Sequence, residues 1–168
     1  MKLFLIGFMG SGKTHWGNHL ASRLSLPFYD LDKVISDNER KSITEIFAEN
    51  GEEYFRYREV EMLEKLVNDN DKFIISCGGG TPCFFNNILF MKNKGKVIWL
   101  NTEVNVLVQR LLKEKQSRPL IKNIADEELK NYILIKILGR KQYYEQADII
   151  VNEETLTLDT FAEIVQNA

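Results

Sequence analysis

The chain has 168 residues, of which 22 are basic and 24 acidic, so its formal net charge is −2 at pH 7. This length favours one compact domain over residues 1–168, and an apolar fraction of 44% supplies enough core to exclude disorder as the main state. The near-neutral charge argues against general binding of nucleic acid or of an anionic membrane. Any site for an anion must therefore be local.

The number of cysteines and the hydropathy of the chain indicate the cellular compartment. Only Cys77 and Cys83 are present, too few for a disulfide framework or for the four ligands of a structural zinc. We expect both to be reduced thiols. No segment approaches the roughly 20 apolar residues that a membrane span requires. We therefore expect a cytoplasmic protein that binds neither nucleic acid nor membrane.

Short apolar runs alternate with longer amphipathic stretches, a pattern typical of βαβ units around a mainly parallel sheet. Five strands are predicted, over residues 2–6, 27–30, 72–77, 96–100 and 148–151. Helices are predicted over residues 12–24, 53–67, 84–94, 104–113, 126–145 and 158–165.

Local signals refine the boundaries. The first helix carries Trp16, Leu20 and Leu24 on one stripe. The sequence Ser-Ile-Thr-Glu at 42–45 is typical of a capping box that begins another helix, which Gly51 would end. Residues 114–125 mix charge with a proline and little periodicity, so they predict a mobile loop that serves as a lid.

Residues 7–14, Gly-Phe-Met-Gly-Ser-Gly-Lys-Thr, fit the P-loop pattern between a predicted strand and a predicted helix. Glycines let backbone amides turn inward around phosphate oxygens, and the helix dipole reinforces the site. We expect Lys13 to reach the β- and γ-phosphates of ATP, and the Thr14 hydroxyl to coordinate Mg²⁺. The predicted nucleotide-binding residues of this segment are Gly10, Ser11, Gly12, Lys13, Thr14 and His15.

Two carboxylates, Asp30 and Asp32, stand at the carboxyl end of the second strand, where open α/β sheets build their ligand crevice. Residues two apart on an extended segment point the same way, so both carboxylates are expected to face the P-loop. Asp30 would then serve the metal, directly or through a water molecule, and Asp32 an acceptor hydroxyl as its base. The alternative is an Asp that caps the helix after the strand.

Further motifs follow in order along nearly the whole chain. They are Ser42-Ile-x-Glu-Ile-Phe47, Gly51-Glu-x-x-Phe55-Arg56-x-x-Glu59, Gly78-Gly79-Gly80, Arg118-Pro-Leu and Arg140-x-x-x-Tyr144. Together with the P-loop and Asp30-x-Asp32, this set resembles the shikimate kinase family. The resemblance implies an α/β P-loop kinase fold of the nucleoside monophosphate kinase type, with a five-stranded parallel sheet flanked by helices. It also implies a substrate-binding helical region near residues 33–61 and a lid at about 114–125.

The activity implied by this resemblance is transfer of the ATP γ-phosphoryl group to the 3-hydroxyl of shikimate. In the family the second Asp of the pair contacts that hydroxyl, which makes Asp32 the base or orienting group. Two arginines grip the shikimate carboxylate, here Arg56 and Arg140, because a guanidinium fork meets a carboxylate with paired hydrogen bonds. Glu59, one helical turn from Arg56, could orient it.

Three further roles follow from the resemblance. The backbone of Gly78, Gly79 and Gly80 packs against the substrate. Arg118 lies in the lid and stabilises charge on the transferring phosphoryl group, as a third catalytic residue beside Lys13 and Asp32. Arg110 stacks its guanidinium plane over adenine.

Departures and rival interpretations stay open at this stage. The family usually has Glu where Ser36 stands, Gly near Arg40, and a hydroxyl residue in place of His15. His15 and His19 lack the Glu of a zinc-binding pair and are expected on the surface, while Phe47, Phe55 and Tyr57 are expected in the core.

Two rival functions remain. One is another small-molecule kinase, acting on gluconate or a nucleoside monophosphate, and the other is a regulatory module without turnover. We expect a monomer.

Overall fold

The computed structural model describes residues 1–118 and 120–167. Its five strands are β1 (Lys2–Ile6), β2 (Phe28–Asp30), β3 (Phe73–Ser76), β4 (Lys96–Asn101) and β5 (Ile149–Asn152). They form one sheet in the order β2-β3-β1-β4-β5, and every neighbouring pair is parallel. The predicted strands and parallel sheet are confirmed, with each strand end within one residue of its predicted place.

The helices are α1 (Lys13–Leu24), α2 (Leu31–Glu39), α3 (Ile43–Asp69), α4 (Asn87–Lys94), α5 (Val104–Glu114), α6 (Asp126–Tyr144) and α7 (Leu158–Gln166). Short 3₁₀ turns occupy Thr81–Cys83, Lys115–Ser117 and Glu153–Thr155. The capping box at Ser42 is confirmed, and Gly51 interrupts α3 with a φ of 81°, which confirms the predicted break. The segment 114–125, predicted as a loop, instead begins with the end of α5 and a 3₁₀ turn. Pro119 of the Arg-Pro-Leu motif lies outside the described residues.

Two further boundaries differ from the predictions. Helix α2 was given no predicted bounds, because residues 30–32 were interpreted as extended; it entered only as the helix that an Asp would cap, and within the helical region that the resemblance implies near residues 33–61. The helix predicted from residue 84 begins at Asn87, since Phe85 and Asn86 adopt left-handed φ values of 48° and 57° that a helix does not accommodate.

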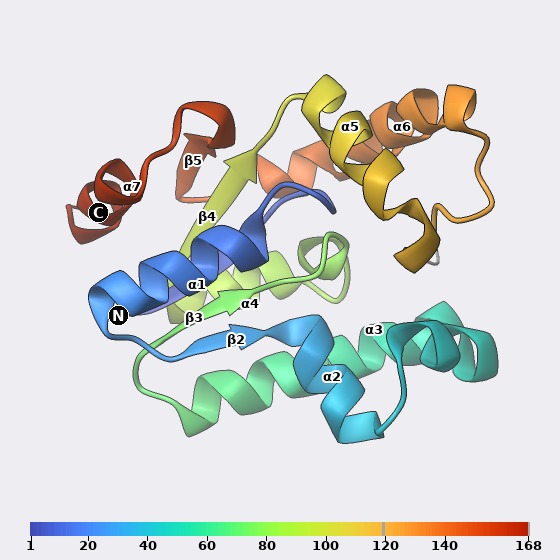
Figure 1. Ribbon diagram of the computed structural model, residues 1–168. Helices are drawn as coiled ribbons and strands as arrows, with labels where there is room; N and C mark the ends of the chain where they lie inside the picture. The colour runs from blue at the N-terminus through green and yellow to red at the C-terminus, as the bar shows by residue number, and fades with distance from the viewer. Residues whose placement is uncertain (119, 168) are drawn as a thin grey trace.

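Alternate residues of β1 point to opposite faces of the sheet and join different layers. Leu3 and Leu5 pack with α1 and α7, whereas Phe4 and Ile6 pack with α2, α3 and α4. The stripe predicted on α1 joins the first of these layers. Figure 1 shows the resulting layers, with α1 and α7 on one side of the sheet and α3 and α4 on the other.

A third cluster lies where α5 and α6 pack together over the P-loop, through Phe8, Leu107, Leu111, Leu129 and Ile133. The pair α5 and α6 and the pair α2 and α3 thus stand on either side of the loop after β1, the central strand (Figure 1). The carboxyl end of the sheet therefore opens between two helical pairs. Within the described ranges, no helix has the length and apolar content to cross a membrane.

Candidate active site

The loop after β1 has the backbone that its glycines predict. Gly7, Gly10 and Gly12 adopt φ values of 142°, 82° and 85°, which residues with a Cβ rarely reach. The Lys13 side chain is buried beneath this loop, and its Nζ donates to the carbonyl oxygens of Gly7 at 2.9 Å and Phe8 at 2.8 Å. Burial lowers the pKa of Lys13 to about 8. The loop, with Lys13 at its base, therefore has the form of a phosphate cradle.

Thr14 and Asp30 lie next to this cradle. The Thr14 hydroxyl donates to Asp30 Oδ2 at 2.6 Å, and Ser76 Oγ lies 3.5 Å from the same hydroxyl. Asp30 also caps α2, because its Oδ1 accepts from the Lys33 amide at 3.3 Å. The capping interpretation of the Asp pair is thus correct, but it does not remove Asp30 from the site. Three oxygen-bearing side chains form a hard donor set of the kind that Mg²⁺ prefers.

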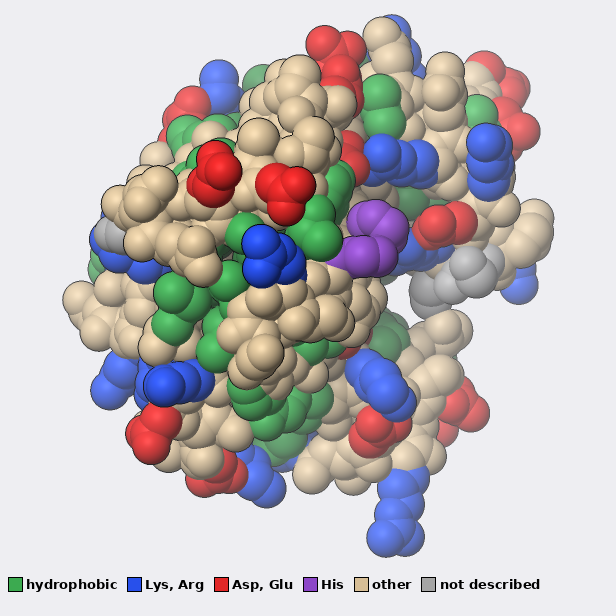
Figure 2. Space-filling view, turned by 60° about the vertical axis from the view of Figure 1, so that its left-hand side comes forward, with side chains coloured by type: hydrophobic (Ala, Val, Ile, Leu, Met, Phe, Trp, Pro, Cys, Tyr) green, Lys and Arg blue, Asp and Glu red, His purple; other side chains and the backbone are tan. Residues whose placement is uncertain are grey.

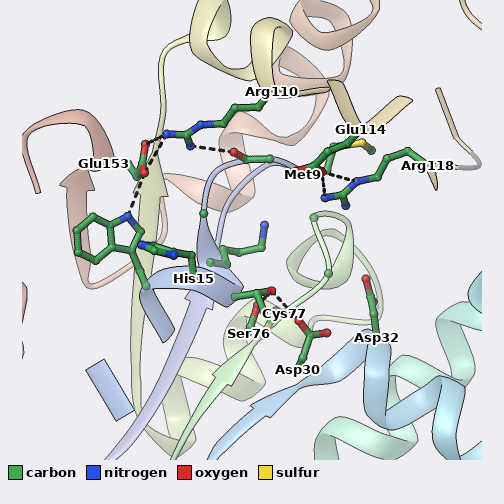
Figure 3. A pocket seen from close by; sticks show the side chains of 17 residues that line it. Met9, His15, Asp30, Asp32, Ser76, Cys77, Arg110, Glu114, Arg118 and Glu153 are labelled. Carbon is green, nitrogen blue, oxygen red and sulfur yellow. Dashed lines mark hydrogen bonds and ion pairs between the residues drawn. The ribbon is translucent and has the colours of Figure 1, made fainter. Parts of the chain in front are cut away.

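Asp32 reaches the site by a different route from the one predicted. It lies in the first turn of α2 rather than on extended chain, so the argument from strand alternation was wrong. The turn nevertheless directs it to the pocket that Lys13, Thr14 and Asp30 line, a cavity of about 560 Å³. Figure 3 shows Asp30 and Asp32 below this pocket and Arg110 and Arg118 above it.

The environment of Asp32 is unusual for a carboxylate. Its Oδ1 is buried and has no hydrogen-bond partner within the part of the chain that the structure describes. Burial, with the nearby charges of Glu59 and Asp30, raises the pKa of Asp32 from 3.8 to about 6. An acceptor atom that is buried and unpaired at the edge of a cavity is suited to receive a hydroxyl donor from a ligand.

A second cavity of about 530 Å³ adjoins the first. Arg56 lines it from α3 and is held by Glu59, whose Oε2 accepts from Nη1 at 2.6 Å, and by Glu52 at 2.9 Å. Glu59 is fully buried and also accepts the Thr81 hydroxyl at 2.5 Å. Burial raises the pKa of Glu59. The predicted pairing of Arg56 with Glu59 is confirmed, and it fixes the guanidinium at the cavity wall.

Arg140 lines the same cavity from α6, so two arginines far apart in the sequence meet there. The glycine run passes between them. A Cβ at Gly79 would lie 3.2 Å from Arg140 Nη1, and one at Gly80 would lie 2.7 Å from Arg56 Nη2. The Tyr144 hydroxyl donates to the Gly79 carbonyl at 2.6 Å and anchors the run. The absence of side chains at these glycines lets both guanidinium groups lie against the backbone.

The remaining wall of the second cavity is apolar. Phe47 and Phe55 line it, and the centroids of their tilted rings lie 4.7 Å apart. Tyr57 is not a core residue, since it is 54% exposed and its ring lies against Phe85. The cavity thus pairs a cationic end with an aromatic side, which fits a small carboxylic acid with a ring.

The arginines predicted at the nucleotide both line the first cavity. Arg118 pairs with Glu114 at 2.5 Å and also lines the second cavity. Arg110 donates to the Gly10 carbonyl at 3.0 Å and pairs with Glu153 at 3.1 Å. The rim above the cradle thereby carries two arginines, each paired with a carboxylate.

His15 lines the first cavity and is exposed. Its ring lies 4.3 Å from that of His19, and Figure 2 shows the two histidines together on the surface. The described residues hold no group of three metal-ligating His, Cys, Asp or Glu side chains. Cys77 and Cys83 are free thiols, as predicted.

Several residues of the site were missed by sequence reasoning. Ser76, Thr81, Trp16 and Glu153 carry no motif of their own. Ser76 and Thr81 flank the glycine run, which is the one signal that could have indicated them. Trp16 and Glu153 are far apart in the sequence, and only the fold brings them together.

Comparison with known proteins agrees with this geometry. The family model described as Shikimate kinase matches residues 9–168. A shikimate kinase of Azobacteroides pseudotrichonymphae is 40% identical over 162 residues, which cover 96% of this chain and 95% of that protein.

Two solved structures extend the likeness to the fold. The crystal structure of shikimate kinase from Bacteroides thetaiotaomicron superposes with a TM-score of 0.92 at 37% identity, covering 99% of this chain and 97% of that one. Shikimate kinase from Acinetobacter baumannii in complex with shikimate gives 0.87 at 30% identity, covering 99% and 90%. Deoxyadenosine kinase from M. mycoides with bound dATP, at 18% identity and a TM-score of 0.62, has the same fold. The family match, the relatives and the architecture agree, and the chain belongs to the shikimate kinase family.

Proposed function

We propose that this chain transfers the γ-phosphoryl group of Mg²⁺-ATP to the 3-hydroxyl of shikimate, giving shikimate 3-phosphate and ADP, through the residues described above. One observation carries the assignment of roles. The two cavities share a wall that contains Asp32 and Arg118. A phosphate donor in the first cavity and an alcohol acceptor in the second would therefore meet at this wall.

The P-loop side holds the nucleotide. The amides around Gly10, Ser11 and Gly12 would bind phosphate oxygens, and Lys13 would exchange its contacts with loop carbonyls for the β- and γ-phosphates. Thr14, with Asp30 directly or through water, would hold Mg²⁺. A metal ion bound there would neutralise phosphate charge during transfer.

The acceptor side selects a carboxylic acid with a neighbouring alcohol. Arg56 and Arg140 would bind the carboxylate with charge-assisted hydrogen bonds, while the backbone of Gly78, Gly79 and Gly80 packs against the ring. Gluconate and nucleoside monophosphates do not combine a ring with a carboxylate. Shikimate supplies both.

The chemistry itself depends mainly on position and charge. The substrate hydroxyl would donate to the unpaired Oδ1 of Asp32, which turns the hydroxyl oxygen toward the γ-phosphorus and can take its proton. Arg118 would leave Glu114 for the transferring group, whose charge it stabilises in the loose transition state. The segment at residues 114–125 would act as the lid that brings Arg118 into place.

The experiment is ADP release with Mg²⁺-ATP and a panel of acceptors: shikimate, quinate, gluconate and nucleoside monophosphates. Shikimate alone should give a strong response. ADP release that responds equally to gluconate or to a nucleoside monophosphate would reject the substrate, and ATP binding without any acceptor-dependent release would indicate a regulatory module.

We also propose that the protein acts as a cytoplasmic monomer that binds neither nucleic acid nor membrane. One chain supplies the linings of both cavities, and the net charge of −2 gives no general attraction for polyanions. Sedimentation at micromolar concentration should give a single species near the chain mass of 19.5 kDa. A stable dimer would contradict the proposal.

A further inference from the structure

Glu153 lines the first cavity together with Arg110 and lies just after β5. It is only 7% exposed, and it receives two donors from distant parts of the chain. Trp16 Nε1 of α1 donates to its Oε1 at 3.0 Å. Arg110 Nη2 of α5 lies 3.2 Å from Oε1 and 3.1 Å from Oε2. One carboxylate thus joins α1, α5 and the segment after the last strand (Figure 3).

This cluster, Trp16, Arg110 and Glu153, also contacts the P-loop at two glycines. Arg110 Nη1 donates to the Gly10 carbonyl at 3.0 Å. A Cβ at Gly12 would lie 3.1 Å from Trp16 Cδ1 and 3.2 Å from Glu153 Oε1. The cluster therefore packs against the outside of the cradle, while the acceptor cavity is lined by other residues.

The charges of the cluster explain why it should be rigid. A carboxylate buried to this degree needs compensating partners: Trp16 and Arg110 both donate to Oε1, and Oε2 has the ion pair with Arg110 but no hydrogen bond among the described residues. In return, Glu153 fixes a long and flexible arginine side chain that is itself 39% exposed. An arginine ordered before the ligand arrives loses less entropy when a base stacks on it, so preorganisation strengthens binding.

We propose that Glu153 is a positioning residue of the nucleotide site: it holds Arg110 in the orientation that stacks on the base, with Trp16 as its second anchor. The inference rests on the proposed function only for the placement of the base beside Arg110. Glu153 acts on the base end and not on the phosphates, so its loss should weaken ATP and spare a ligand that has no base.

The test compares Mg²⁺-ATP with Mg²⁺-tripolyphosphate by isothermal titration calorimetry, without any acceptor. Glu153→Ala should weaken ATP about tenfold, as expected for loss of a hydrogen-bonded charge, and leave tripolyphosphate within about twofold. Glu153→Gln keeps an oxygen for Trp16 but loses the charge that holds Arg110, so it should fall between Glu153→Ala and the unchanged protein. Glu154→Ala is the matched control, because Glu154 is the exposed neighbour and accepts only from the Glu103 amide among the hydrogen bonds described.

A double-mutant cycle identifies the route of the effect. In the Arg110→Ala background, adding Glu153→Ala should cause little further loss of ATP affinity, because the residue that Glu153 positions is then absent. In steady-state kinetics the KM for ATP should rise while kcat and the KM for shikimate stay within about twofold. Additive effects of the two substitutions would overturn the proposal.

Two other results would also overturn it: unchanged ATP affinity in both Glu153 variants, or equal loss of ATP and tripolyphosphate, which would mean damage to the cradle itself. If Glu153→Ala does not fold, the comparison of ATP with tripolyphosphate binding is made with Glu153→Gln, and its result decides whether the proposal holds. Failure of the proposed function would appear separately, as the absence of shikimate-dependent ADP release by the unchanged protein. The acceptor-free binding measurements do not depend on that activity.

Discussion

Replacing Asp32 by Asn should make the protein more stable and nearly inactive. The carboxyl of Asp32 is mostly buried, its Oδ1 has no hydrogen-bond partner in the described chain, and its pKa is raised from 3.8 to about 6 by burial and then by Glu59 and Asp30. A pKa change of this size corresponds to roughly 3 kcal/mol in favour of the neutral form. Because the side chain keeps some contact with solvent, screening reduces the cost of its charge to about 1–2 kcal/mol.

The pH window follows from the direction of this pKa change. The folded protein binds the Asp32 proton more tightly than the unfolded chain, so the stability that the group contributes is complete below pH 3.8 and is lost as the pH rises to about 6. An amide has no such loss. The free energy of unfolding of Asp32→Asn should therefore exceed that of the unchanged protein by about 1–2 kcal/mol at pH 7.5, and the difference should nearly vanish at pH 4.

Urea denaturation at both pH values measures the difference, and ADP release measures the activity. The variant should lose about 10²-fold or more in kcat, since it can neither accept a proton nor orient the hydroxyl in the same way. Equal or lower stability at pH 7.5 would refute the reasoning, because it would mean that the carboxylate is compensated in the fold. A rate close to that of the unchanged protein would remove Asp32 from the catalytic role.

The other predictions concern the two arginines of the acceptor cavity, the lid and one backbone position. Arg56→Ala or Arg140→Ala should raise the KM for shikimate about 30-fold or more, which corresponds to about 2 kcal/mol, and leave the Kd for ATP within about twofold. An equal loss of affinity for both substrates would contradict the assignment. Arg118→Ala should lower kcat about 10²-fold with a modest change in the KM for shikimate, and unchanged turnover would exclude it from catalysis. Arg40 has a left-handed φ of 53° at the end of α2, so Arg40→Gly should stabilise the fold by about 0.5–1 kcal/mol in urea denaturation. Ser22→Gly, inside α1, is the matched control and should destabilise by about 1 kcal/mol.

Much of the fold follows from local patterns in the sequence. The strands are short, mostly apolar runs bounded by polar residues. β1, β3 and β4 are buried on both faces of the parallel sheet, whereas the edge strands β2 and β5 are partly exposed. Hydropathy alone locates these runs. Gly51, with its positive φ, and the capping box, in which the side chains of Ser42 and Glu45 accept from each other's backbone amides, are likewise local signals. Helix α2 was not located because its signal is weak: four of its nine residues are charged, and it begins at Leu31, directly after β2 ends at Asp30.

The residues of the site likewise divide into those that a local sequence pattern indicates and those that only the fold brings together. The P-loop is contiguous and could be predicted completely, and the motifs that carry Arg56 and Arg140 indicated residues that the structure brings to one cavity. The hydrogen bond from Trp16 to Glu153 spans 137 positions and has no local pattern. Contacts of that kind depend on which elements the sheet order places side by side. Asp32 shows a third case, since the predicted location was right and the predicted backbone was wrong.

The wall shared by the two cavities has a consequence for inhibition. Asp32, Gly78, Gly79 and Arg118 face both sides of it, so a molecule that links an adenosine oligophosphate to a cyclic acid could occupy both compartments at once. Once one half is seated, the other is confined to the immediate neighbourhood of its own compartment, and its effective concentration there is set by the tether. Such a bisubstrate compound would compete with both natural ligands, and it would do so with an avidity that neither half attains alone.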